Sequence, residues 1–238
     1  MEIILISLLV VLASILGTIA GFGVSTIMIP VLLIFLPLTP VLLFAGIIHF
    51  ADDIWKIILF RKGLKWKLIL LFGIPGIFAA YLGAKLIFNI PEEILSRTLG
   101  AFLISYSVLV LLKPDFKIKQ NNFTSVFGGF LSGFFAGIFG LGGAVKGAFL
   151  SSFNLRKTVY IATMGAIAFA IDITRISTYL INGVKLEGIY LQGLLLFIPL
   201  SFLGAYFGKK AVDKIPQKYF RETIMVFLIL IGIRLLFF

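Results

Sequence analysis

Hydrophobic residues occupy most positions of the chain in long runs, and short polar segments separate these runs. Such runs predict helices that cross a membrane several times. We identify ten apolar elements, near residues 3–20, 22–36, 41–60, 67–88, 94–112, 124–139, 141–151, 157–181, 188–208 and 218–237. The second and seventh are too short to cross a hydrocarbon core of about 30 Å comfortably. The pattern therefore predicts an all-α integral membrane protein with about 8–10 transmembrane or re-entrant helices.

Glycines interrupt the chain next to both short elements. The stretch Ser132–Phe149 reads SGFFAGIFGLGGAVKGAF, and the stretch Gly17–Gly23 reads GTIAGFG. A glycine inside a helix costs about 1 kcal/mol relative to alanine. In lipid, a broken backbone is tolerated only where protein buries it or where it lines a wet cavity. We therefore expect each short element to form a broken hairpin with its predecessor, and such pairs point to the substrate site of a transporter.

The composition narrows the class of protein further. Hydrophobic residues make up 61% and charged residues 13% of the chain, which is about half of the charged fraction of a soluble domain. Cysteine is absent and there is one histidine, which excludes disulfides, thiol catalysis and multi-histidine metal sites. No metal site or cofactor is predicted. We also expect no cleavable signal peptide, because the start MEIILISLLVVLASILG lacks a basic segment before its apolar run.

The charges between the apolar elements predict the orientation of the chain. With the N-terminus outside, the inner segments together account for the whole net charge of +11, and the outer segments sum to zero. The inner segments are Arg61–Lys67, Lys113–Phe123, Ser152–Lys157 and Lys209–Glu222. Because basic residues collect on the cytoplasmic side, we expect both termini outside and each broken hairpin to return to the side from which it came. The basic residues report orientation in this interpretation, so nucleic acid is not a predicted partner.

Several motifs occur twice, in the same order in both halves. They are Gly17-x-x-Ala20-Gly21 with Gly133-x-x-Ala136-Gly137, Asp52 and Gly63-x-Lys65 with Asp172 and Gly183-x-Lys185, and Tyr81-x-Gly83-x-Lys85 with Tyr206-x-Gly208-x-Lys210. Chance can produce the first match, but the third continues to a shared Ile-Pro pair and argues against chance. Five elements per half is an odd number, so the second repeat is predicted to lie inverted. The expected parts are a first repeat (1–112), a cytoplasmic linker (113–123) and a second repeat (124–238).

Two glycine-broken motifs, each opening a block of four helices in a basic apolar chain, resemble the sulfite exporter TauE/SafE family. The motifs are Gly17-Thr-Ile-Ala-Gly21-Phe-Gly23 with Pro30, and Gly133-Phe-Phe-Ala-Gly137-Ile-Phe-Gly140-Leu-Gly142-Gly143. The resemblance implies a permease for small sulfur-containing or organic anions, such as sulfite, thiosulfate and sulfoacetate. It also implies the cell (inner) membrane of a bacterium or archaeon. The chain departs from the usual motifs at Val24-Ser25-Thr26 and at Lys146.

Half-helices that begin after each glycine cluster would direct unsatisfied N–H groups into the protein centre, which favours an anion there. Hydroxyl groups and two cations could add to this expected anion site, which we call the cradle. The hydroxyls can instead bond to carbonyls of their own helix, and Lys146 can extend to the headgroups. Helix packing is the alternative for Gly17 and Gly133, but we do not expect it for Gly140, Gly142 and Gly143. The candidate substrate-binding residues are Gly21, Gly23, Ser25, Thr26, Gly140, Gly142, Gly143, Lys146 and Arg175.

The helix predicted over residues 41–60 carries ionisable residues on one broad face. They are His49, Asp52, Asp53 and Lys56. Ionisable groups at this depth are expensive and mark a functional site by default. One interpretation is a relay in which His49 and an aspartate load and release a coupling proton, and the alternative is an aspartate paired with Lys56. We expect Asp53 to make that pair and Asp52 to be functional, because Asp172 matches Asp52 in the repeat.

Asp172 and Arg175 lie one turn apart in the element predicted over 157–181. Asp52 belongs to the first repeat and Asp172 to the second. We expect a polar cluster around each of them, on opposite sides of the anion site, and this arrangement suggests two gates. The alternative is an intrahelical pair of Asp172 with Arg175 that has no role in transport. The candidate residues for proton coupling or gating are His49, Asp52, Asp53 and Asp172.

These observations predict a secondary transporter of small anions that works by rocking one repeat against the other; its expected partners are the anion and the lipid bilayer. Two other classes are considered. An intramembrane enzyme could place a metal at His49, Asp52 and Asp53, but the chain lacks a second cluster of acids to complete that site. A structural assembly factor would have no central cavity and would tolerate Lys146→Ala and Arg175→Ala. An enzyme is not predicted.

Overall fold

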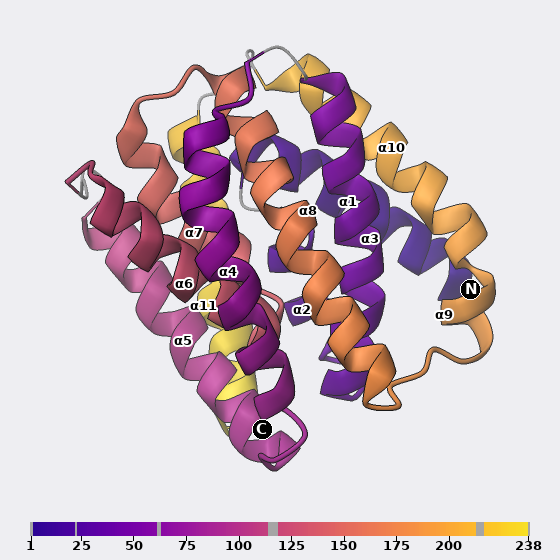
Figure 1. The fold of residues 1–238 in the computed structure, drawn as a ribbon. Helices are drawn as coiled ribbons and strands as arrows, with labels where there is room; N and C mark the ends of the chain where they lie inside the picture. Colours follow the sequence, from indigo (N-terminus) through magenta and orange to yellow (C-terminus); the bar gives the residue numbers. More distant parts are fainter. Residues whose placement is uncertain (1, 22, 61–62, 114–118, 213–216, 238) are drawn as a thin grey trace.

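The computed structural model describes residues 2–21, 23–60, 63–113, 119–212 and 217–237, and its elements there are helical throughout (Figure 1). The helices are α1 (Glu2–Ala20), α2 (Ser25–Leu32), α3 (Leu38–Leu59), α4 (Trp66–Leu86), α5 (Glu92–Leu112), α6 (Asn122–Phe139), α7 (Gly142–Leu150), the 3₁₀ turn η1 (Ser151–Phe153), α8 (Lys157–Ile181), α9 (Gly188–Gln192), α10 (Leu194–Ala211) and α11 (Gln217–Phe237). The predicted all-α fold is confirmed. Parts of three predicted inner segments (61–62, 114–118 and 213–216) lie outside the described residues.

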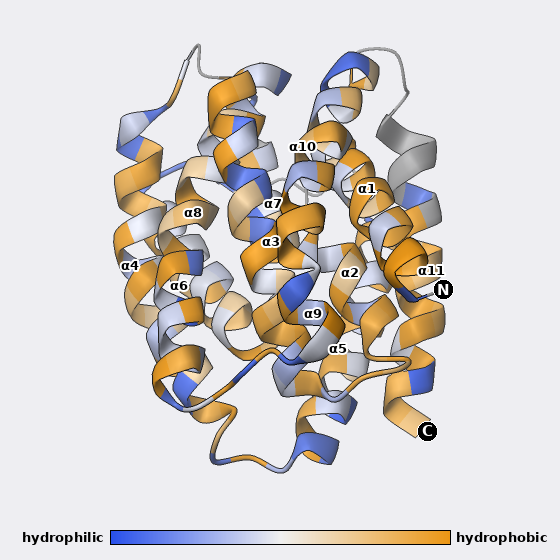
Figure 2. Cartoon of the chain, turned by 90° about the vertical axis from the view of Figure 1, so that its right-hand side faces the viewer, coloured by the Kyte–Doolittle hydropathy of each residue, from blue (hydrophilic) through white to orange (hydrophobic). Residues whose placement is uncertain are grey.

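Six of the described helices are long and apolar enough to cross a membrane: α1, α4, α5, α6, α8 and α10. Hydrophobic colours dominate the ribbons of these helices in Figure 2. Helix α3 is as long, but it carries Asp52, Asp53 and Lys56 in its second half. The predicted element 188–208 differs in detail, because the short α9 precedes α10, which extends to Ala211. The chain is a multi-pass membrane protein.

The two short helices are buried and do not span a bilayer. Eight residues in α2 and nine in α7 correspond to about 12 and 14 Å of helix, against about 30 Å of hydrocarbon. Gly140 ends α6 in the left-handed region (φ 69°), a conformation that glycine adopts without steric cost. Helix α7 then folds back along α6, so that Gly128 lies against Phe149. The expected broken hairpins are therefore present as short, buried helices.

Helices α3 and α8 cross in the middle of the molecule (Figure 1). The rings of Phe50 and Phe169 stack with centroids 4.8 Å apart, and further along α3 the backbone of Asp53 lies against Gly165 of α8. Later residues of α3 thus meet earlier residues of α8, so the two helices run antiparallel. This crossing brings the ionisable residues of both helices into one interior region.

Glycines allow the closest helix approach in the fold, between α4 and α6. A Cβ on Gly133 would collide with the carbonyl of Gly76, and one on Gly137 would collide with the carbonyl of Ala80. Small residues at such positions let helix backbones come into direct contact. On the other side of the central pair, α1 packs against α10, where a Cβ on Gly208 would lie 2.8 Å from Thr18 (Figure 1). Gly133 is accordingly a packing residue, one of its two expected roles.

The connections gather at two opposite ends of the bundle. At one end, Lys209 donates from Nζ to the carbonyl of Leu59 (2.8 Å), and Lys157 donates to that of Val212 (2.7 Å). At the other end, Arg234 donates to the carbonyl of Ile34 (3.2 Å), and the amide of Leu38 donates to Glu92. The first group joins segments that were predicted to be inner, and the second joins segments that were predicted to be outer.

Candidate functional site

The interior crossing of α3 and α8 holds a cluster of charged residues that water hardly reaches. Seven acidic or basic side chains in the described part of the chain are buried: His49, Asp52, Asp53, Lys56, Lys146, Asp172 and Arg175. Isolated charges in such surroundings are strongly unfavourable, so they are expected to pair with one another or with a ligand. Their partners therefore indicate which groups are satisfied by the protein alone.

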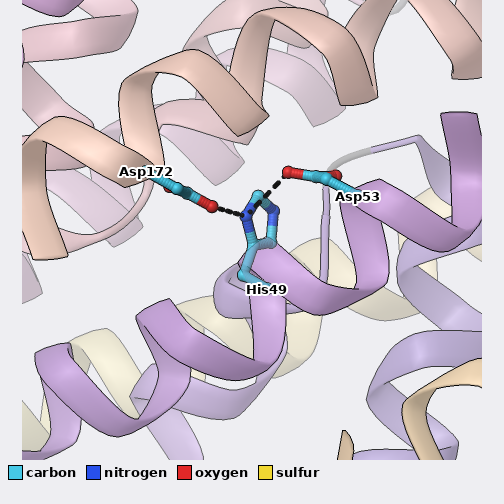
Figure 3. Close-up of side chains that lie close together, drawn as sticks. All are labelled: His49, Asp53 and Asp172. Atoms are coloured by element: carbon cyan, nitrogen blue, oxygen red, sulfur yellow. Dashed lines mark hydrogen bonds and ion pairs between the residues drawn. The ribbon is translucent and has the colours of Figure 1, made fainter.

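His49 joins the two halves of the chain through one ring nitrogen (Figure 3). Its Nδ1 lies 2.6 Å from Oδ2 of Asp172 on α8 and 3.2 Å from Oδ2 of Asp53 on its own helix. Histidine and Asp53 are four residues apart, which places them on one face of α3. Asp172 is 123 residues away, and the repeat motif matched it with Asp52 but did not predict its contact with His49.

Lys56 pairs with both adjacent aspartates, so the expected pair with Asp53 is present, but the closer pair is with Asp52. Lys56 lies 2.5 Å from Asp52 but 3.5 Å from Asp53. Asp52 is therefore the main partner of Lys56, whereas Asp53 faces His49. Neighbouring residues on a helix point about 100° apart, so only one of the two could face the α8 side, and the crossing of α3 with α8 selects Asp53.

Arg175 is anchored to Asp172 but keeps one donor free. Its Nε donates to Oδ1 of Asp172 (2.6 Å) and its Nη2 to Oγ of Ser25 (3.4 Å). The intrahelical pair that we considered for Arg175 is therefore present. Nη1 is buried and has no hydrogen-bond partner among the described residues, and it lies beside Gly140, where an added Cβ would be 3.1 Å away. Ser25 in turn donates to the carbonyl of Ala45 on α3 (3.4 Å), not to its own helix.

Lys146 points into the protein and not to the headgroups. It is the middle residue of α7, it is only 3% exposed, and its Nζ donates to the carbonyl of Met164 (3.1 Å). It makes no ion pair with any carboxylate among the described residues. An ammonium group has three donors, so this buried cation retains both donors and charge for a ligand.

Two small adjoining cavities lie between the glycine clusters and the charged residues, and each has room for about one water molecule. His49, Gly143 and Lys146 line both of them. Of the candidate substrate-binding residues, those at the cavities are Gly21, Gly23, Gly140, Gly142, Gly143 and Lys146. Of the candidate coupling residues, those at the cavities are His49, Asp53 and Asp172.

Four candidates do not line the cavities among the described residues. Ser25, Thr26 and Arg175 are buried beyond them, and Asp52 is turned toward Lys56. Lys56, which we had considered only as a structural partner, does line a cavity. Its spacing of three residues from Asp53 was the signal that could have placed it there.

Gly142 has a packing role as well as a place at the cavity. A Cβ on Gly142 would collide with the carbonyl of Ser132 on α6. A substitution at this position would therefore disturb the α6–α7 hairpin and the cavity together.

His49 and Asp172 are in contact as hydrogen-bonded groups, and Asp53 lies beside the same ring nitrogen. Single atoms of the three residues lie within 4.8 Å of one another, so α8 adds one carboxylate to the group that the enzyme alternative placed on α3 alone. The 2.6 Å between Nδ1 and Asp172 is a hydrogen-bond distance. Two atoms bound to one metal ion at about 2.0 Å each would stand further apart. The geometry thus favours proton sharing.

Long apolar helices around a buried charged centre, with two short helices that end inside it, are features of a membrane transporter. Residues 6–235 match the family model described as Sulfite exporter TauE/SafE. The chain therefore belongs to this family of anion permeases, whose members are membrane transporters and not enzymes. The resemblance drawn from the glycine motifs is thus confirmed. No curated protein matches the chain.

Proposed function

We propose that this protein is a permease for small sulfur-containing or organic oxyanions and that the anion binds at the two cavities beside Lys146. The observation that carries the proposal is the buried ammonium of Lys146, which has no carboxylate partner among the described residues. A buried charge without a counter-ion is strongly unfavourable. An anion in the cavity would pair directly with this ammonium and accept the hydrogen-bond donors that the protein leaves free.

The backbone on two sides of the cavities adds to the affinity for an anion. Helix α7 begins at Gly142, and Gly143 lines both cavities. The first amides of a helix have no acceptor within the helix and carry its positive end. Gly21 and Gly23, in the left-handed region before α2, line the first cavity. Nη1 of Arg175, behind Gly140, is a further donor that becomes available when the site widens.

The site is too small for an oxyanion in the described conformation, because each cavity has room for about one water molecule. We therefore assign this conformation to a closed stage of alternating access. Opening toward either end of the bundle would widen the cavities and admit the anion. The cluster of His49, Asp53 and Asp172 lines the same cavities, so a coupling proton held there would respond to the anion directly.

An inverted relation between the repeats remains our proposal, and the packing supports it. If α1 corresponds to α6 and α4 to α10, then exchanging the repeats turns the α1–α10 contact into the α6–α4 contact, and both are observed. Corresponding helices also run oppositely: α3 against α8, and α5 against α11, where Gly100 meets Leu236 and Ile104 meets Gly232. Two repeats that each have an odd number of elements, and therefore lie in opposite orientations, would produce these antiparallel pairs.

The test is flux of sulfite, thiosulfate and sulfoacetate into proteoliposomes. We expect uptake of at least one of the three, and we expect Lys146→Met to reduce that uptake by more than tenfold. The matched control is Lys185→Met, which removes an exposed lysine from the loop after α8. Absence of flux for all three anions, or full flux in Lys146→Met, would overturn the proposal.

A further inference from the structure

The buried charges of the described residues cancel when His49 is neutral. The three carboxylates are Asp52, Asp53 and Asp172, and the three cations are Lys56, Lys146 and Arg175. An anion that enters this interior would leave one uncompensated negative charge in a medium where such a charge is strongly unfavourable. A proton that enters with the anion would restore the balance.

The hydrogen bonds of His49 fix the nitrogen at which such a proton can be added. Ionised carboxylates only accept hydrogen bonds, and Nδ1 faces two of them, so Nδ1 carries a hydrogen. That hydrogen is donated to Asp172 at 2.6 Å. Oδ2 of Asp53, at 3.2 Å, is left without a hydrogen-bond partner among the described residues. The other nitrogen, Nε2, is therefore the free basic atom of the ring.

Nε2 lies on the side of the ring that faces the glycine break before α2. A Cβ on Gly23 would overlap Nε2, and both Gly23 and His49 line the first cavity together with Lys146. A proton added at Nε2 would thus make an imidazolium next to the anion on one side. On its other side, the positive ring would face Asp53 and Asp172, which stabilise it.

We infer that His49 takes up a proton at Nε2 when the anion binds and carries this proton across the membrane with it. The inference rests on the proposed function. Binding forms the Nε2–H bond with a proton from the side of anion entry, and release of the anion on the other side breaks this bond. The charged groups around the ring are Asp52, Asp53 and Lys56 on α3, Asp172 and Arg175 on α8, and Lys146 on α7. Helix α10, which also packs against α3, contributes Lys209 only at its end, near Leu59.

The first test uses the fact that the chain has one histidine. In protein labelled with ¹⁵N-histidine, without a histidine tag and reconstituted in lipid, every imidazole signal belongs to His49. We expect Nδ1 to be protonated without ligand, and Nε2 to become protonated when thiosulfate or sulfoacetate, whichever gave the larger flux, replaces chloride at neutral pH. An Nε2 that stays unprotonated with the anion bound would overturn the inference.

The second test measures proton movement during uptake of the same anion, with a pH-sensitive dye inside the proteoliposomes. We expect at least one proton to enter with each anion. In His49→Gln, we expect uptake of the anion to fall more than tenfold, because the neutral amide cannot take up the compensating proton, while the melting temperature in detergent stays close to that of the unaltered protein. A purely structural role of His49 would lower the uptake and the melting temperature together.

The two proposals fail in different ways. Flux without accompanying protons would remove the inference about His49 and leave the permease proposal intact. Absence of flux would already have removed the permease proposal in the earlier assay.

Discussion

The imidazole of His49 occupies the space that a side chain on residue 23 would need. Gly23 has a φ of 85°, and a Cβ built on it would overlap Nε2 of His49. The conformation itself disfavours L side chains by about 1–2 kcal/mol. The glycine break before α2 and the ionisable cluster on α3 are therefore one structural unit, although 26 positions of sequence separate them.

The contact predicts that Gly23→Ala abolishes anion uptake, because the methyl group would displace the imidazole from its carboxylate partners. The measurement is flux in proteoliposomes together with the melting temperature in detergent. Gly183→Ala is the matched control: Gly183 has a similar φ of 87°, but nothing lies within 4 Å of its Cβ position. It should lose only the small stability that the backbone strain implies, and equal loss of flux in both variants would refute the contact as the cause.

A second prediction concerns the seam between α4 and α6. Gly133→Ala would drive a methyl group into the carbonyl of Gly76, and neither backbone can move without separating the helices. We expect a melting temperature lower by several degrees and a reduced yield of folded protein. The control is Gly73→Ala. Gly73 also lies on α4, but nothing lies within 4 Å of its Cβ position. It should be neutral or stabilising, by up to about 1 kcal/mol.

Breaking the Asp172–Arg175 pair should destabilise the protein far more than breaking a surface pair. Asp172→Asn leaves Arg175 as a buried cation without its carboxylate, a change that typically costs about 3–5 kcal/mol. The comparison is Glu93→Gln, which removes a pair with Arg97 whose side chains are 71% and 60% exposed. Thermal unfolding of both variants decides the point, and similar melting temperatures would contradict it. The double variant Asp172→Asn/Arg175→Gln should recover part of the loss.

The absence of cysteine makes the orientation directly testable. We predict that Lys119→Cys is labelled by a membrane-impermeant maleimide only after cells are permeabilised, whereas Lys185→Cys is labelled in intact cells. Both lysines are exposed, and they belong to segments predicted on opposite faces. Labelling in the reverse order would place the basic face outside and overturn the predicted orientation.

The hydrophobic pattern and the glycines predicted the helices and both broken hairpins, because these features follow from local sequence. The sequence also identified the charged residues of α3 as candidates, because ionisable groups are rare inside a membrane-spanning helix. The choice between Asp52 and Asp53 could not be predicted, since both lie on α3 and only the position of α8 decides which one faces His49. The contact between His49 and Asp172 likewise depends on how two distant helices cross, and no local pattern encodes that crossing.

The tight seam between α4 and α6 bears on how the molecule can move. It joins a helix of the first half to a helix of the second, with glycine backbone against backbone, and α1 is joined to α10 across the same boundary. If one half rocked against the other, the α4–α6 and α1–α10 interfaces would both have to separate. We therefore expect the bodies that shift during a transport cycle to be composite, each built from helices of both halves.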